Sequence, residues 1–123
     1  MYTMPYRCAI VDDEPLAREL LSNYLSKMEH MELVIATDQL HTVMELVNER
    51  AIDLILLDVN IYGRQTSGLN QLLKNTDCRF IVVTAYPLAS LGDIPLGGRH
   101  GYLPKPVSFS RFKDQVTKML KIA

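Results

Sequence analysis

Residues 53–59, DLILLDV, decide the fold of this chain. Four consecutive apolar residues, 54–57, lie between two aspartates, Asp53 and Asp58. A short, uninterrupted apolar run is typical of a central strand in a parallel sheet, where both faces of the strand are covered. A carboxylate at the end of such a run is costly to desolvate unless something pairs with it. The run therefore predicts a buried strand and raises the question of what pairs with Asp58.

Apolar runs alternate with segments of helical periodicity on both sides of this strand. The other strands are predicted at 6–11, 32–38 and 79–85, with the end of a fifth at 101–106. Helices are predicted after 15, around 43–47, after 68 and over 109–120. Five short strands that alternate with helices predict a doubly wound parallel α/β sheet with right-handed crossovers.

The segment after the first strand is a well-marked amphipathic helix. Pro15 suits the first turn of a helix, where its missing N–H costs nothing. An apolar stripe follows at a spacing of about 3.6 residues, made of Leu16, Ala17, Leu20, Leu21, Tyr24, Leu25 and Met28. This spacing predicts a strong amphipathic helix.

Length and composition fit one soluble domain over residues 1–123. The chain is 48% hydrophobic and 22% charged, and its formal net charge of −1 gives no reason to expect nucleic acid or a membrane as direct partner. No apolar run approaches the length of a membrane span, and no signal-peptide pattern is seen, so we expect a cytoplasmic protein. Cys8 and Cys78 are expected to be buried free thiols, with a disulfide as the alternative.

Residues 87–101 depart from the alternation of strands and helices. They contain four of the six glycines and two of the six prolines of the chain. Pro87 could begin a helix, but Pro95 would remove a hydrogen bond inside it and clash with the preceding turn. We expect one or two helical turns near 88–92 at most, and hence a shortened or irregular fourth helix.

Polar residues stand at the carboxyl ends of the predicted strands, which meet at one edge of a parallel sheet. They are Asp12, Asp13, Glu14, Asp58, Thr84 and Lys105. Clustered carboxylates repel one another and call for a cation, and an all-oxygen site suits Mg²⁺. One carboxylate could then attack a phosphoryl group, while a lysine and a hydroxyl stabilise the phosphoryl oxygens.

Each of these residues also has a simpler interpretation. Acids after a strand often cap the next helix, a threonine in a strand is ordinary, and a single lysine is usually solvated. The coincidence of all of them at matching strand ends favours a phosphoryl-transfer site.

Four segments together resemble the receiver domain of two-component response regulators: IVDDEPLARELL, LILLDV, VVTAY and GYLPKP. The resemblance extends over essentially the whole chain, and VDDEPLAR with TAY is most similar to receivers of LytTR-class regulators. It implies a flavodoxin-like fold with the strand order 2-1-3-4-5. It also implies a signalling domain, not an enzyme, that promotes its own phosphorylation and dephosphorylation.

By position, the resemblance implies a role for each residue of the site. Asp58 would accept a phosphoryl group from the phosphohistidine of a sensor histidine kinase. Asp13 would bind Mg²⁺ directly, Asp12 would bind it largely through water, and Asp58 and the backbone carbonyl of Asn60 would complete the protein ligands.

The resemblance also implies a conformational switch. Thr84 would hydrogen-bond the phosphoryl group, and Lys105 would pair with it. Tyr102 stands where the family has its switch aromatic, although a half-buried core residue is the alternative. The Lys105–Pro106 peptide would be cis. Partners would include a second copy, through the fourth helix, fifth strand and fifth helix, and an output domain outside this chain that could bind DNA.

The loop after Asp58 departs from the family pattern. Ile61 and Tyr62 replace a Met-Pro pair, and Gly68 lies ten positions beyond Asp58, which implies an insertion of two residues. Arg64 is expected to be solvated, with an interaction at the site as the alternative. Tyr62 and Tyr86 could shield the acceptor from water or could be surface aromatics.

These departures leave a second function open. A pseudo-receiver would keep the fold as an interaction or dimerisation module and would not depend on phosphorylation. A Mg²⁺-dependent phosphohydrolase is disfavoured, because the sequence offers no acid or base that would turn over an aspartyl phosphate quickly, beyond Asn60, which could only orient a water.

Overall fold

The computed structural model describes residues 5–58, 78–85 and 100–120. Within these ranges it contains strands and helices in alternation. They are β1 (Tyr6–Val11), α1 (Pro15–Ser26), β2 (Met31–Thr37), α2 (Leu40–Asn48), β3 (Leu54–Leu57), β4 (Arg79–Thr84), β5 (His100–Pro104) and α4 (Phe109–Leu120). The label α4 belongs to the helix after β5, over the range where the sequence predicts the last helix.

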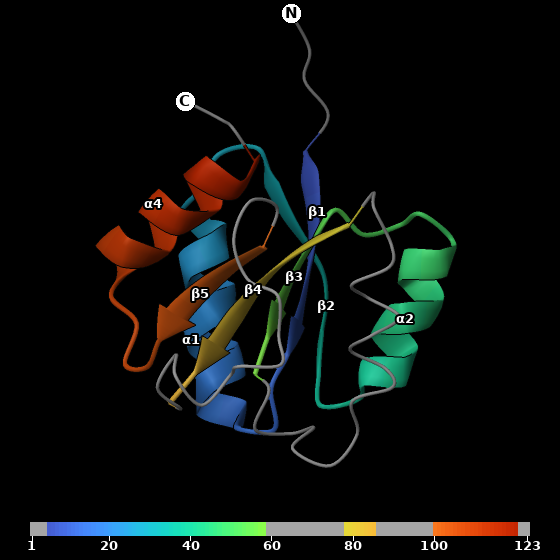
Figure 1. Ribbon diagram of the computed structural model, residues 1–123, viewed down its shortest axis with the longest axis horizontal. Helices are drawn as coiled ribbons and strands as arrows, with labels where there is room; N and C mark the ends of the chain where they lie inside the picture. The colour runs from blue at the N-terminus through green and yellow to red at the C-terminus, as the bar shows by residue number, and fades with distance from the viewer. Residues whose placement is uncertain (1–4, 59–77, 86–99, 121–123) are drawn as a thin grey trace, which may run out of the picture.

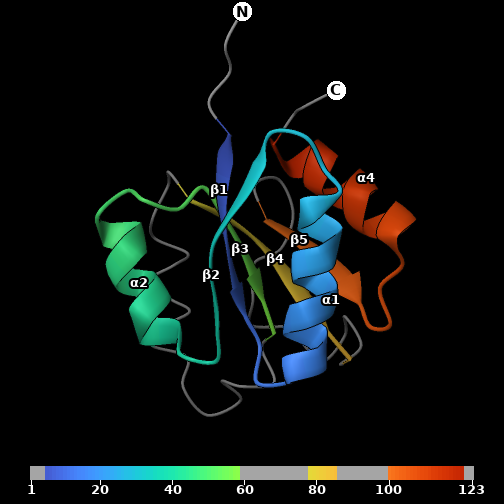
Figure 2. The same ribbon diagram turned by 180° about the vertical axis from the view of Figure 1, so that it is seen from behind.

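The strands form one parallel sheet in the order β2-β1-β3-β4-β5. Helices α1 and α4 cover one face of this sheet, and α2 lies against the other (Figures 1 and 2). The strand order and the helices on both faces confirm the predicted doubly wound α/β fold.

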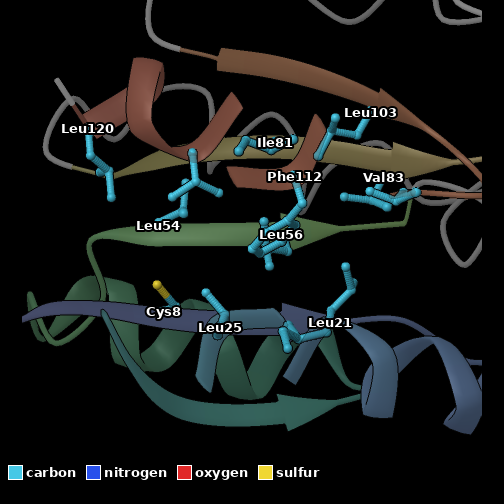
Figure 3. Close-up of a cluster of buried hydrophobic side chains, with 13 residues drawn as sticks. Cys8, Leu21, Leu25, Leu54, Leu56, Ile81, Val83, Leu103, Phe112 and Leu120 are labelled. Atoms are coloured by element: carbon cyan, nitrogen blue, oxygen red, sulfur yellow. The ribbon is translucent and has the colours of Figure 1, made fainter. Parts of the chain in front are cut away.

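The predicted central strand is buried along its whole length. All four residues of β3 are buried, and it pairs with β1 on one side and β4 on the other. Because side chains alternate along a strand, Leu54 and Leu56 face α1 and α4, whereas Ile55 and Leu57 face α2. Figure 3 shows the cluster on the first of these faces, where Leu56 and Phe112 meet. The continuous apolar run thus supplies both cores of the domain.

Helix α1 begins at Pro15, as predicted, and buries only part of its apolar stripe. Leu21 and Leu25 are buried against the sheet. Leu16 is 78% exposed and Leu20 is 40% exposed. These two side chains line a groove between α1 and the loop after β5.

The two cysteines are free and buried, which confirms the expectation of buried thiols. They belong to opposite cores, Cys8 to the one under α1 and α4 and Cys78 to the one under α2.

Several predictions concern residues outside the described ranges. These are the helix after Gly68, the loop with Asn60, Tyr62 and Arg64, Tyr86, and residues 87–99 of the glycine- and proline-rich segment. The last two residues of that segment, His100 and Gly101, are described and begin β5. Among the described helices, none is long and apolar enough to cross a membrane.

Candidate phosphoacceptor site

The parallel register brings the predicted site residues to one edge of the sheet. Val11 pairs with Leu57, so the residues that follow them, Asp12 and Asp58, come next to each other. The Asp58 amide N–H donates to the carbonyl of Val11, and the Asp12 N–H donates to the carbonyl of Thr37. Both aspartates are therefore positioned by the hydrogen-bond ladder of the strands before them.

The same arrangement repeats on the other side of β3. Thr84, the last residue of β4, pairs with Pro104, the last residue of β5. The Lys105 amide N–H donates to the carbonyl of Thr84 over 2.9 Å, so Lys105 continues the ladder by one residue. The Lys105–Pro106 peptide is cis, as the resemblance implies.

Lys105 answers the question of what pairs with Asp58. Its Nζ lies 2.9 Å from Asp58 Oδ2, 2.9 Å from Asp12 Oδ2 and 3.0 Å from Glu14 Oε1. The side chains of Asp12 and Asp58 are only 1% and 2% exposed, and that of Lys105 is 17% exposed. One ammonium thus compensates two carboxylates that are almost fully removed from water.

These contacts control the protonation of Lys105. Burial alone would lower the pKa of the ammonium, because it disfavours the charged form. The hydrogen bonds to Asp58, Asp12 and Glu14 together outweigh burial and raise the pKa above its ordinary value. Lys105 is therefore a permanent cation at neutral pH.

Asp12 has a structural role as well as a place in the site. Its Oδ1 accepts the Glu14 amide N–H over 2.9 Å, and its backbone carbonyl accepts a hydrogen bond from Arg18. The simpler interpretation of an acid that organises the start of a helix therefore applies to Asp12, while its Oδ2 faces Lys105. Arg18 was not predicted as part of the site, although its position one turn after Glu14 indicates that it lies on the same side of α1.

The carboxylates form a group that can hold a cation. Asp12, Asp13, Glu14 and Asp58 each offer an oxygen, and these oxygens all lie within 4.8 Å of one another. Asp12 and Asp58 are buried, whereas Asp13 and Glu14 are exposed. A compact, all-oxygen donor set that is open on one side fits Mg²⁺, which keeps several of its waters.

Thr84 and Tyr102 lie on the same face of neighbouring strands. Thr84 is fully buried, and Val82, two residues before it, pairs with Tyr102. Because alternate residues of a strand share a face, Thr84 and Tyr102 both point to the side that α2 covers. Tyr102 is half-buried and packs against the core on that side. This position is compatible with a switch and with an ordinary core residue.

The loop after β5 is tied to α1 beyond the site itself. The Tyr24 hydroxyl donates to the carbonyl of Val107 over 2.7 Å, and its ring packs on Phe109 and Phe112. Lys105 is thus followed by a loop that α1 holds through a hydrogen bond and an aromatic cluster.

Most of the chain matches one known protein family. The model of the response regulator receiver domain matches residues 8–117. The chain belongs to this family, and its function lies in two-component signalling.

Relatives agree with this assignment. The transcriptional regulatory protein MalR of Bacillus subtilis is 31% identical over 88% of this chain and 47% of its own length. The sensory transduction protein LytR of Staphylococcus saprophyticus is 30% identical over 92% of this chain and 45% of its own. The chain therefore spans about half the length of these relatives, and its match to LytR supports the LytTR-class resemblance.

The fold is shared with CheY of Borrelia burgdorferi, solved as a CheX–CheY–BeF₃–Mg²⁺ complex. The TM-score is 0.78 at 18% identity, over 95% of this chain and 90% of the other.

Proposed function

We propose that this chain is a phosphoacceptor module that receives a phosphoryl group on Asp58 from a sensor histidine kinase in a Mg²⁺-dependent reaction. The observation that carries the proposal is the Lys105 ammonium, which lies 2.9 Å from both Asp12 and Asp58 beside the group of four acids. An ammonium at this distance from a buried carboxylate can exchange the carboxylate oxygen for an oxygen of a phosphoryl group bound to Asp58.

In the proposed step, an oxygen of the Asp58 carboxylate attacks the phosphorus of a phosphohistidine. A P–O bond forms as the P–N bond breaks, the imidazole leaves, and Asp58 becomes an acyl phosphate. Lys105 moves from Asp58 Oδ2 to a phosphoryl oxygen, and the Thr84 hydroxyl donates to another. Because the Asp58 side chain is almost fully buried, these charge interactions are stronger than they would be in water.

Asp12, Asp13, Asp58 and the carbonyl of Asn60 would hold the Mg²⁺, the last of these from outside the described residues. When bound, Mg²⁺ supplies positive charge that offsets the carboxylates and the phosphoryl oxygens. The neighbouring Glu14 carboxylate lies in the same group of acids.

The signal would leave the site through Thr84 and Tyr102. A phosphoryl group on Asp58 would draw the Thr84 hydroxyl toward it, and Tyr102 would turn inward on the same face of the sheet. We further propose that the surface around β5 and α4 dimerises in response. The residues 1–123 would serve as one receiver module that controls an output domain, which could bind DNA.

A groove beside the site supports a kinase partner. It has a volume of about 440 Å³ and lies between α1 and the loop after β5, lined by Leu16, Leu20, Pro106 and Val107 among others. Lys105 and Glu14 line it too. We propose that the phosphohistidine-bearing helix of the partner packs on the exposed Leu16 and Leu20, which would bring the histidine to Asp58.

Incubation with acetyl phosphate and Mg²⁺, followed by intact-mass measurement, tests the proposal. The wild type should gain one phosphoryl group, and Asp58→Asn should gain none. Asp53→Asn is the matched control, because it neutralises the acid at the other end of β3 and should be phosphorylated normally. A folded wild type that binds Mg²⁺ but gains no phosphoryl group would overturn the proposal in favour of the pseudo-receiver.

A further inference from the structure

We propose that Glu14 is a positioning residue that retains Lys105 in the resting state and opposes the phosphorylated state. The inference rests on the proposed function, because it concerns the regulation of the same site. It begins from the 3.0 Å contact between Glu14 Oε1 and Lys105 Nζ.

The number of donors on Lys105 makes Glu14 a competitor. An ammonium has three N–H donors and no acceptor. Asp12, Asp58 and Glu14 each lie within hydrogen-bond distance of Nζ, so all three donors have a carboxylate partner. In the proposed step Lys105 gives up Asp58 Oδ2 for a phosphoryl oxygen, and any further donor that turns to the phosphoryl group must be released by Asp12 or Glu14.

Glu14 differs from the other two partners in its surroundings. Asp12 and Asp58 are buried, whereas the Glu14 side chain is 62% exposed. Glu14 is also the N-cap residue of α1, yet its side chain makes no capping hydrogen bond. Within the described part of the chain, its side chain accepts one hydrogen bond, from Lys105. Its side chain is therefore available for regulation without a cost to the helix.

The position of Glu14 is fixed by its backbone. The Glu14 N–H donates to Asp12 Oδ1, which anchors the residue directly beside the site. The side chain then extends from the start of α1 to the loop after β5. A phosphoryl group on Asp58 would add negative charge close to this carboxylate, and the two anions would compete for the same ammonium.

Removal of Glu14 should therefore favour the phosphoryl-bound form. Beryllofluoride, which mimics a phosphoryl group on an aspartate, can be titrated at saturating Mg²⁺ into Glu14→Gln and Glu14→Ala. Tyrosine fluorescence or NMR reports the binding. We expect Glu14→Ala to bind about two- to fivefold more tightly than the wild type, as for loss of an exposed ion pair. Glu14→Gln should lie between them, since its amide oxygen can still accept from Lys105.

A second readout needs no metal and no phosphoryl mimic. The ¹³Cε–¹Hε resonance of Lys105 should shift in metal-free Glu14→Ala, because Lys105 loses one of its partners. Glu19→Gln is the matched control, since it removes one negative charge from an exposed position on α1. It should leave both the resonance and the affinity at wild-type values.

The outcomes separate this inference from the proposed function. If the wild type binds beryllofluoride and Glu14→Ala binds it equally or less tightly, the role of Glu14 is overturned and the proposed function stands. An unshifted Lys105 resonance in Glu14→Ala also overturns it. If neither the wild type nor any variant binds beryllofluoride, the proposed function fails, and the regulatory role fails with it. A shifted Lys105 resonance in Glu14→Ala would then show only that Glu14 and Lys105 are in contact.

Discussion

Asp53 and Asp58 lie at opposite ends of the four-residue strand β3, and each is held by one basic side chain in a different environment. Asp53 accepts a hydrogen bond from the backbone N–H of Arg7 and two more from its guanidinium group, through Nε and Nη2. Both side chains are partly exposed. Asp58 is buried and faces Lys105, which it shares with Asp12 and Glu14. The same residue type therefore joins two strands at one end of β3, and at the other end it lies in the proposed phosphoacceptor site.

Asp53→Asn should have a small effect. The pair with Arg7 is solvent-accessible, so its loss is expected to lower the free energy of unfolding only slightly. Urea denaturation measures this change. A large loss of stability, or a loss of beryllofluoride binding, would show that Asp53 does more than join β3 to β1.

Lys105→Met should destabilise the metal-free protein by about 3 kcal/mol, because Asp12 and Asp58 would then be buried without a cation. Saturating Mg²⁺ should restore part of this loss. Urea denaturation with and without Mg²⁺ measures both effects.

Lys118→Met is the matched control for this variant. Lys118 pairs with Asp114 on the exposed surface of α4, so the loss should stay below about 0.5 kcal/mol and should not respond to Mg²⁺. If the two lysine variants were equally stable without metal, the buried carboxylates would not depend on Lys105.

Stability should fall at alkaline pH through Lys105. Its pKa is raised in the folded state, so the folded protein retains this proton more firmly than the unfolded chain. The resulting stabilisation is complete below the ordinary lysine value of 10.5 and is lost as the pH rises above it. Unfolding free energies measured between pH 8 and pH 12 should show a steeper alkaline loss in the wild type than in Lys105→Met.

Cys8 also contributes to the loss of stability at alkaline pH, in the wild type and in Lys105→Met alike. Burial raises the pKa of its thiol from 9.0 to about 12. The thiol therefore ionises at a lower pH in the unfolded chain than in the folded protein, and the folded protein loses stability relative to the unfolded chain as the pH rises above 9.0. Cys8→Ala in both backgrounds isolates the contribution of Lys105. Equal slopes in these two proteins would contradict the prediction for Lys105.

Thr84→Val should weaken beryllofluoride binding about tenfold, because it removes a hydroxyl that would donate to a charged group and nearly preserves the side-chain shape. Thr84→Ser keeps the hydroxyl and should bind close to the wild type. Fluorescence titration at saturating Mg²⁺ compares them. Equal affinity of the valine and serine variants would remove Thr84 from the proposed site.

The sequence allowed much of the fold to be predicted, because its signals are local. The apolar run of β3, the period of α1 and Pro15 at its first turn each identify an element from adjacent residues. The predicted strands fix where each strand ends, and the carboxyl ends of parallel strands meet at one edge of the sheet. Asp12, Asp58 and Lys105 were therefore expected to converge there. Their contacts confirm that convergence.

Side-chain partners were harder to predict, because they join residues that are distant in the sequence. Neither periodicity nor spacing indicates that Tyr24 donates to Val107 or that Arg7 holds Asp53. Leu16 and Leu20 fit the helical stripe but line an open groove, since the period of a helix does not show which of its apolar residues the rest of the chain covers.

The carboxyl ends of the strands have a consequence for how such a chain can change over evolutionary time. The backbone N–H groups of Asp12, Asp58 and Lys105 each donate to a carbonyl at the end of a neighbouring strand. A change of length in the connections after these positions leaves the hydrogen bonds at the strand ends in place. The connections can therefore diverge, and with them the partners that they meet, while the relative positions of Asp12, Asp58 and Lys105 are kept.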